Sequence, residues 1–231
     1  MTKTNQQKVK DFLINNGVII VMFILVIYTG FTSDNFFTKN NFMNILMNMS
    51  SRLVIALGIA GCVITAGCDL SAGRMIGFGA CISGMLLQRM DYSGKFFPDM
   101  QPLNVFVVAL IAMLVCAAFG TVTGFFIAYL NVPPFIATLA MMEIVYGIGL
   151  IVTNATPLGG YVEQYTNVSN GKFLGINYLI WIAIIVAAIT WFIFNMTRHG
   201  KYMYAIGGNP QAAEVAGVPV KLTLILIYMK A

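Results

Sequence analysis

The sequence has few charged residues. Asp, Glu, Lys and Arg make up 9% of its 231 residues, whereas soluble domains carry about 25%. Hydrophobic residues account for 59%, and the mean hydropathy is +0.84. These proportions exclude a soluble globular domain and predict an integral membrane protein. The net charge of +5 does not indicate a nucleic-acid partner, because the basic residues stand singly at the ends of apolar runs.

Cysteine and histidine are also scarce. The four cysteines lie in apolar runs, at spacings unlike those of metal sites or disulfide frameworks, so packing is their expected role: Cys62, Cys68, Cys81 and Cys116. The single histidine, His199, lies outside the apolar runs, where a solvated loop position is expected. No G-x-S-G-type nucleophile turn accompanies a histidine in a membrane helix, which disfavours an intramembrane hydrolase.

Four apolar runs are long enough to cross a bilayer: residues 12–31, 105–130, 135–152 and 176–194. A spanning helix needs about 20 residues. Hydrocarbon offers no water to backbone groups, so these segments must satisfy their hydrogen bonds internally. The expected fold class is all-α, a polytopic bundle of about six transmembrane helices, some of them broken. No repeat or linker divides the chain, and residues 1–231 are expected to form one domain.

Two further runs, residues 53–66 and 75–87, are too short to span comfortably and are rich in glycine. Such runs are typical of broken helices beside a transport pathway. Upstream, residues 42–51 are apolar but contain Asn44 and Asn48. This segment has three possible placements: as an extension of the first short run, at the membrane interface, or packed against neighbouring helices.

The N-terminus has features of a signal peptide, with Lys3, Lys8 and Lys10 before an apolar run, but no A-x-A-like cleavage site follows. We therefore expect a retained first helix whose N-terminus is cytoplasmic. Six crossings then place residues 197–221 on the cytoplasmic side. Slightly more basic residues fall inside than outside, which agrees weakly with the positive-inside rule.

A polar island, TRHGKYMYAIGGNPQAAEVAGVPVKL, follows at residues 197–222. Asn209 and Pro210 predict a helix start there, because an Asn side chain caps orphan amides and Pro at the first helical position removes no needed donor. Gly217 predicts the stop. The helix has about two turns, too few to be stable alone. A helix lying on the membrane surface and a helix that docks a soluble partner both satisfy this pattern.

Several motifs resemble one family. AIGGNPQAAEVAGV is similar to the cytoplasmic coupling loop of the sugar-importing ABC-transporter permeases of the ribose, xylose and galactoside group. VITAGCDLSAGRMIG and GFFIAYLNVPPFIATLA extend the likeness over nearly the whole chain. Residues 69–100 most resemble the permease of the galactose/methyl-galactoside importer. The resemblance implies a permease subunit in a bacterial inner membrane that couples ATPase motion to monosaccharide import.

The resemblance also implies site residues. The residues that would form or shape the ATPase-coupling helix are Gly208, Asn209, Pro210, Ala212, Ala213, Glu214 and Gly217. The turn between two broken helices, beside the translocation path, would contain Asp69, Leu70, Ser71, Gly73 and the adjoining Arg74.

Partners follow from the same resemblance. They are an ATP-binding cassette ATPase, a periplasmic or lipid-anchored sugar-binding protein and a second permease copy. No Walker A pattern, G-x-x-x-x-G-K-[ST], occurs in the sequence. ATP and magnesium are therefore expected on the separate ATPase, and this chain is expected to be non-catalytic, with no cofactor of its own.

Three features each permit two interpretations. Asp69 and Arg74, at the boundary of two apolar runs, either pair or cap the helix break, or contact sugar or ATPase directly. Glu143, in the middle of an apolar run, either lines the pathway or is protonated and bonded to a neighbouring helix. Gly120 and Gly124 form a G-x-x-x-G pair that packs a helix closely, either within the subunit or across a dimer.

The C-terminus departs from the family. Its members continue for several more helices, whereas this sequence stops about ten residues into the next apolar run, at LTLILIYMKA. We therefore expect a C-terminally truncated permease, either a fragment or the product of a frameshift. The alternative functions are a non-functional fragment and a secondary transporter driven by protons through Glu143 and Asp69. Uptake that survives proton uncoupling but stops on ATP depletion favours the ABC importer.

Overall fold

The structure is a computed structural model that describes residues 13–14 and 16–231 of the chain. The chain divides into two compact units, Met1–Asn48 and Met49–Ala231. Lys3, Lys8 and Lys10, on which the expected N-terminal orientation depends, lie outside the described residues. The expectation of a single domain stays a prediction.

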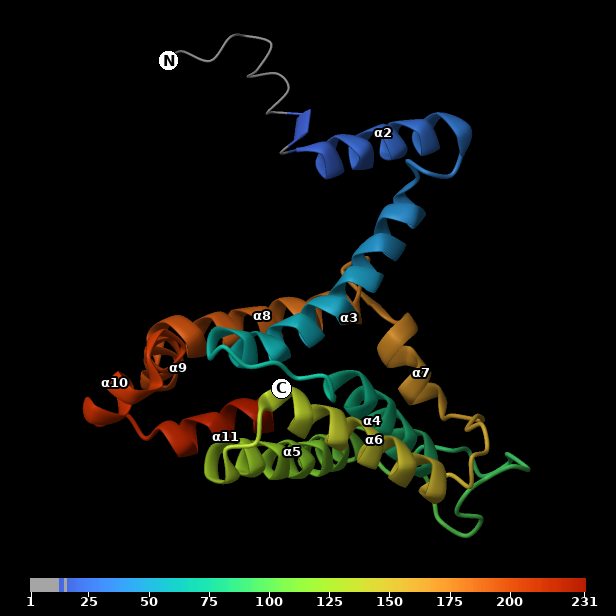
Figure 1. Cartoon of the computed structure of the whole chain (residues 1–231). Coiled ribbons are helices and arrows are strands. Elements are labelled where there is room, and N and C mark those ends of the chain that lie inside the picture. Colours follow the sequence, from blue (N-terminus) through green and yellow to red (C-terminus); the bar gives the residue numbers. More distant parts are fainter. Residues whose placement is uncertain (1–12, 15) are drawn as a thin grey trace. The chain divides into compact units, whose positions relative to one another are not determined.

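Figure 1 shows a chain built almost entirely of helices. In chain order they are α2 (Gly17–Thr32), α3 (Lys39–Ile64), α4 (Ala72–Leu86), α5 (Val105–Leu130), α6 (Pro134–Val152), α7 (Glu163–Asn170), α8 (Tyr178–Met196), α9 (Arg198–Gly208), α10 (Pro210–Val215) and α11 (Val220–Lys230). Two short strands, β1 (Lys172–Phe173) and β2 (Ile176–Asn177), form an antiparallel hairpin before α8. The predicted all-α class is confirmed, and the hairpin is a small addition that the hydropathy pattern does not indicate.

In the first unit, α2 is apolar throughout and has no buried residue. Its hydroxyl groups are satisfied within the helix, as when Thr29 donates to the Leu25 carbonyl at 2.7 Å. The Thr38 hydroxyl accepts from the Asn41 amide at 3.3 Å and so caps the start of α3. The predicted span of residues 12–31 corresponds to α2, which has 16 residues and is shorter than the four helices long enough to cross a membrane; residues 12 and 15 lie outside the described residues.

Among residues 13–14 and 16–231, four helices are long and apolar enough to cross a membrane: α3, α5, α6 and α8. α5 has the predicted bounds, and α6 begins one residue earlier than predicted. α8 begins two residues later than predicted because Ile176 and Asn177 belong to β2, and the Asn177 side chain then caps the helix by accepting from the Leu179 amide at 2.8 Å. The chain is a multi-pass membrane protein.

α3 corrects the prediction for residues 53–66. It is one continuous helix of 26 residues rather than a short or broken segment, and residues 42–51 extend it. Asn48 does not interrupt the helix because its side-chain amide donates to the Asn44 carbonyl at 2.9 Å. α4, with 15 residues, is short as predicted.

In the second unit, α11 packs along α5 (Figure 1). A Cβ atom at Gly120 would overlap the Tyr228 carbonyl oxygen, and one at Gly124 would lie 2.7 Å from the Ile225 Cα. The two backbones therefore touch directly, as small residues allow between membrane helices. The G-x-x-x-G pair packs within the subunit, the first of its two interpretations.

Two apolar clusters lie on either side of this contact. One joins α3, α5, α9 and α11 through Cys62, Ile127, Met203, Ile227 and Tyr228. The other joins α4 and α6 through Phe78, Ile82, Met141 and Val145, with α5 side chains packed against it. Most of the remaining apolar side chains on the spans are exposed, as expected for helices that face lipid.

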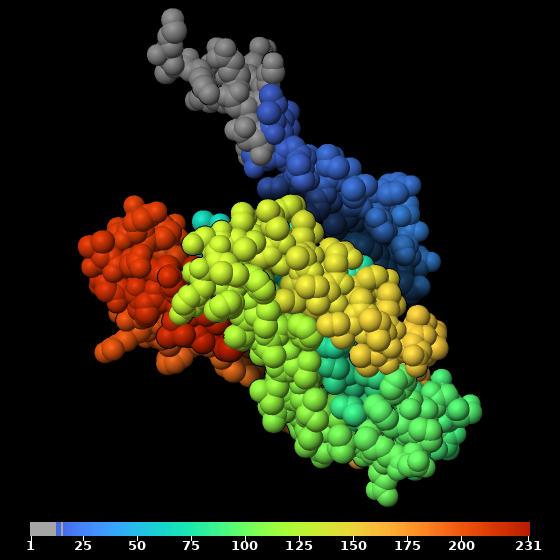
Figure 2. Space-filling view, turned by 60° about the horizontal axis from the view of Figure 1, so that its bottom comes forward, coloured from blue at the N-terminus to red at the C-terminus, as the bar shows by residue number. Residues whose placement is uncertain are grey.

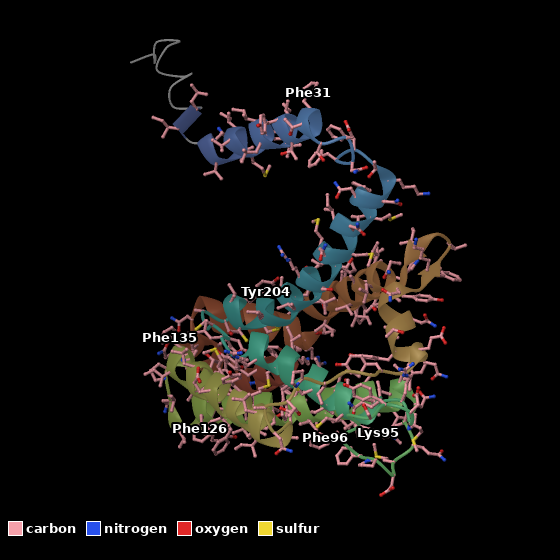
Figure 3. All side chains as sticks on the ribbon, turned by 90° about the vertical axis from the view of Figure 1, so that its right-hand side faces the viewer. Phe31, Lys95, Phe96, Phe126, Phe135 and Tyr204 are labelled. Carbon is pink, nitrogen blue, oxygen red and sulfur yellow. The ribbon has the colours of Figure 1, made fainter. Side chains whose placement is uncertain are left out.

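The second unit has two distinguishable ends. At one end, α9 touches the last turn of α3, since a Cβ at Gly207 would overlap the carbonyl oxygen of the final α3 residue. At the other end, the buried Gln88 donates to the Gly159 carbonyl at 3.0 Å and accepts from the Phe96 amide at 2.7 Å, which ties the loop after α4 to the loop after α6. Figure 3 shows Phe135 at the first end and Phe96 toward the second.

Gly124→Ala is expected to weaken the packing of α11 on α5, although alanine favours a helix over glycine by about 0.5–1 kcal/mol. The added Cβ presses on the Ile225 backbone, and overpacking costs about 1–3 kcal/mol. The thermal unfolding midpoint of the purified chain in detergent should therefore fall. Gly77→Ala is the control, because a Cβ there meets nothing within 4 Å. Equal midpoints for both variants would contradict the backbone contact.

Candidate functional site

The polar island folds into two consecutive helices, α9 and α10. At their junction Asn209 has an extended backbone, with φ −158° and ψ 106°, which ends α9 and starts α10. Its side-chain oxygen accepts a hydrogen bond from the Ala212 amide at 3.0 Å. Pro210 occupies the first turn, where its missing N–H leaves no gap in the hydrogen bonding. The predicted cap and helix start are confirmed.

The end of α10 is also held by its own backbone. Gly217 has φ +82°, a left-handed conformation that disfavours side chains with a Cβ. Its amide donates to the Glu214 carbonyl, and the Val218 amide donates to the Ala213 carbonyl, each at 3.0 Å. This is the Schellman pattern of a helix C-terminus. A helix too short to persist alone is thus closed at both ends.

α10 presents most of its side chains outward. Ala213 is buried, with 4% of its surface exposed, whereas Val215 is 91% exposed. Ala212 and Glu214 are also exposed, and a Cβ at Gly208 meets nothing within 4 Å. Figure 2 shows α9 and α10, in red, at one edge of the second unit. The segment therefore offers an accessible face of small and apolar groups beside one carboxylate.

The second group of predicted site residues lies in the connection between α3 and α4. One carboxylate oxygen of Asp69 accepts from the Ser71 amide at 2.8 Å and from the Ser71 hydroxyl at 2.6 Å. Ser71 is buried and precedes the first residue of α4, whereas Leu70 and Gly73 are exposed. Asp69 thus shapes the turn that precedes α4, whose N-cap residue Ser71 makes no side-chain capping bond to the helix.

Arg74 contacts an aromatic ring and not Asp69. Its guanidinium carbon lies 4.1 Å from the centre of the Tyr146 ring, a cation–π contact that joins α4 to α6. Asp69 contacts Ser71 instead, so the ion pair between Asp69 and Arg74, one of the open interpretations, is not formed in the structure. The physical reason is that the Tyr146 ring on α6 binds the Arg74 guanidinium, while the Asp69 carboxylate accepts its hydrogen bonds from Ser71 within the turn.

A cavity of about 310 Å³ opens between α4, α5 and α11. Its lining includes Asp69 and Ser71 from the turn, Thr123 from α5, and Lys230 from α11, set among apolar side chains. These polar groups come from three elements far apart in the sequence. The structure thus places two of the predicted pathway residues on a cavity wall.

Glu143 faces away from the core of its own unit. Met141 and Val145, on either side of it along α6, are buried in the apolar cluster with α4, whereas Glu143 is exposed. Among the described residues it makes neither a hydrogen bond nor an ion pair. Neither interpretation of Glu143 is tested by these contacts, and its role stays a prediction.

His199 differs from expectation. It is half-buried within α9 rather than solvated in a loop, and it lines a second cavity of about 340 Å³ together with Lys230. Burial, and secondarily the Lys230 charge, lowers the pKa of His199, which favours the neutral imidazole at pH 7. Among residues 13–14 and 16–231, no group of three His, Cys, Asp or Glu side chains could hold a metal ion.

Sequence reasoning missed Tyr146, Tyr228 and Lys230 as members of these sites. Tyr146 lies within an apolar run and outside the quoted motifs. Tyr228 and Lys230 could have been found from the sequence, because they place a phenol and an ammonium group in an apolar run, where polar groups need partners.

Apolar spans, a cavity between helices whose lining includes a few polar side chains, and a capped helix outside the spans are the features of a membrane permease. The chain belongs to the family described as "branched-chain amino acid transport system / permease component", which matches residues 41–230.

Individual relatives are similar over nearly the whole chain. The galactose/methyl galactoside import permease protein of Escherichia coli K12 is 40% identical over 235 residues, which cover 99% of this chain and 70% of the relative. The protein of the same name from Haemophilus influenzae is 41% identical, over 100% of this chain and 71% of the relative. The ribose import permease protein of Escherichia coli K12 is 31% identical, over 95% of this chain and 66% of the relative. No solved structure matches the chain.

Asn209→Ala is expected to loosen α10, because losing an N-cap side chain costs about 0.5–2 kcal/mol. The amides of residues 211–216 should then exchange hydrogen for deuterium faster in the purified chain, while those of α9 stay unchanged. Asn209→Ser is the matched control, since a serine hydroxyl at the N-cap can also accept a hydrogen bond from the Ala212 amide. Equal exchange rates in the alanine and serine variants would show that the side chain does not hold α10.

Proposed function

We propose that this chain is the membrane-spanning permease subunit of an ATP-driven bacterial importer of monosaccharides, with galactose or methyl galactosides as substrates. The observation that carries the proposal is the identity of about 40% to galactose/methyl galactoside import permeases over the whole chain. The lower identity to ribose import permeases makes ribose-like sugars the second substrate class. The chain moves the sugar without changing it covalently and is not an enzyme.

In this proposal α10 is the contact with the ATPase subunit. Its exposed face of Ala212, Val215 and Glu214 fits a groove on a soluble protein, and its hydrogen-bonded ends keep that face rigid. Preorganisation of this kind lowers the ordering cost of docking. Glu214 meets basic groups of the ATPase. ATP and magnesium bind to that subunit, because this sequence contains no Walker A pattern.

The orientation follows from charge. Arg198, Lys201 and Lys221 lie at or near the ends of α9 and α11, in the segment that carries α10. Basic residues between spans favour the cytoplasmic side. We therefore place this segment in the cytoplasm and the loop around Gln88 outside the cell, in the bacterial inner membrane, with the N-terminus cytoplasmic. A periplasmic or lipid-anchored binding protein delivers sugar to the outer end, and a second permease copy completes the path.

The polar cavity supports a role for the α3–α4 turn in translocation. Sugar hydroxyls require hydrogen-bonding groups inside a membrane, and Asp69, Ser71 and Thr123 all line the cavity. The hydroxyls of Ser71 and Thr123 already donate within the protein, to Asp69 and to the Phe119 carbonyl, so they offer acceptor oxygens. Asp69 already accepts two hydrogen bonds through one oxygen, and the second oxygen is available to a hydroxyl.

The test is sugar uptake by proteoliposomes containing the chain, its ATPase subunit and its binding protein. Radiolabelled galactose should accumulate with ATP inside, continue when a protonophore abolishes the proton gradient, and stop when ATP is replaced by a non-hydrolysable analogue. Ribose serves as the competing substrate. Uptake that follows the proton gradient and ignores ATP would overturn the proposal and establish a secondary transporter.

Glu143→Gln is expected to change galactose uptake in the same proteoliposomes while leaving the amount of assembled complex unaltered. The substitution keeps the shape of the side chain and removes its ionisable group, and an ionisable group within a membrane span is typically functional because it is costly there. Glu163→Gln, on α7 outside the spans, is the matched control. Unchanged uptake at normal assembly would remove Glu143 from the path.

A further inference from the structure

α11 connects the two candidate sites directly. It begins at Val220, a few residues beyond α10, and packs backbone to backbone along α5. Its last turns line the cavity that Asp69 and Ser71 also line. α11 thus runs from the end of the α10 segment to the cavity and lies directly against the α5 backbone at Gly120 and Gly124.

Tyr228 is the point where α11 meets the α3–α4 connection. Only 2% of its surface is exposed. Its hydroxyl donates to the Cys68 carbonyl at 3.4 Å, and a Cβ at Gly67 would overlap that hydroxyl. The residue that follows Cys68 is Asp69, so this contact holds the start of the cavity wall.

α9 touches the same connection from another side. Met203 packs with Tyr228 and Cys62 in one buried cluster, and Gly207 lies against the last turn of α3. The segment between α3 and α4 thus contacts both α9, which precedes α10, and α11, which follows it. Ala66, at the start of this segment, has φ +57°, a conformation that non-glycine residues adopt at a cost of about 1 kcal/mol. Backbone held in a sparsely populated conformation is typical of places that switch.

We propose that Tyr228 is a positioning residue that transmits movement of α10 to the α3–α4 turn and so links ATP hydrolysis to opening of the sugar cavity. The inference rests on the proposed function, in which α10 receives the ATPase movement. Tyr228 also lines the cavity, but it is 2% exposed, and in this proposal it acts through the Cys68 carbonyl and the Gly67 backbone.

The experiment measures galactose uptake per ATP hydrolysed in proteoliposomes with saturating binding protein. Tyr228→Phe removes the hydroxyl and keeps the ring, and Gly67→Ala inserts a methyl group where the hydroxyl lies. Each should lower uptake per ATP by about threefold to tenfold, the equivalent of one hydrogen bond. In the double variant the hydroxyl is absent, so the Gly67→Ala methyl group has room. Its uptake per ATP should therefore be no lower than that of Tyr228→Phe alone. Such a departure from additivity indicates direct contact between the two residues.

Two matched controls isolate the position. Tyr161→Phe also removes a tyrosine hydroxyl that donates to a backbone carbonyl, that of Leu158 at 2.8 Å, but in the loops around Gln88. Gly77→Ala adds a methyl group where nothing lies within 4 Å. Both should keep the ratio of the unmodified chain.

A second measurement does not depend on how well a variant folds. In the unmodified complex, ATP binding should change the rate at which a maleimide alkylates the half-buried Cys68, with the fully buried Cys62 as reference, resolved by mass spectrometry of peptides. A Cys68 rate that ignores nucleotide would overturn the inference.

The outcomes separate the two proposals. Absence of ATP-dependent monosaccharide uptake by the unmodified complex would overturn the proposed function and, with it, the inference. Normal uptake with unchanged ratios in both single variants would overturn the inference alone. A parallel fall in complex, ATPase activity and uptake at constant ratio would assign Tyr228 a structural role only.

Discussion

The direct contact between the backbones of α5 and α11 supports the rest of the second unit. Between helices in hydrocarbon, the hydrophobic effect gives little attraction, so close van der Waals contact decides which faces meet. Gly120 and Gly124 provide that contact. With α11 in this position, Tyr228 reaches the α3–α4 connection and the polar cavity forms beside it. Stability and communication between the sites therefore depend on the same pair of glycines.

Much of the fold follows from one-dimensional patterns. The bounds of α5 and α6 follow from apolar length, and the ends of α10 follow from Asn209 and Gly217, because spans and caps are local in sequence. The length of α3 could not be predicted, because Asn44 and Asn48 leave three placements open for residues 42–51 and the apolar run at 53–66 is too short to span by itself. In the helix the Asn48 side-chain amide donates to the Asn44 carbonyl one turn earlier, and a hydropathy profile does not detect such a bond.

The sequence predicted the residues of the candidate site but not the long-range contacts between them. The residues of α10 and of the α3–α4 turn were found from motifs. Their partners were not, since the ring beneath Arg74 and the phenol beside Cys68 come from helices about 70 and 160 positions further along the chain. An opposite charge five residues away was the obvious partner for Arg74, and the structure shows that a distant aromatic ring takes that place. Long-range pairing of this kind is set by packing, which a single sequence does not specify.

The two ends of α10 are held by Asn209, Gly217 and backbone hydrogen bonds, none of which involves the side chains on its exposed face. The shape of the helix and the chemistry of its surface are consequently separable. Substitutions at Ala212, Glu214 or Val215 change the exposed surface while the hydrogen bonds that end the helix remain. Under the proposed ATPase contact, the choice of partner and the stability of the membrane-embedded part are therefore set by different residues.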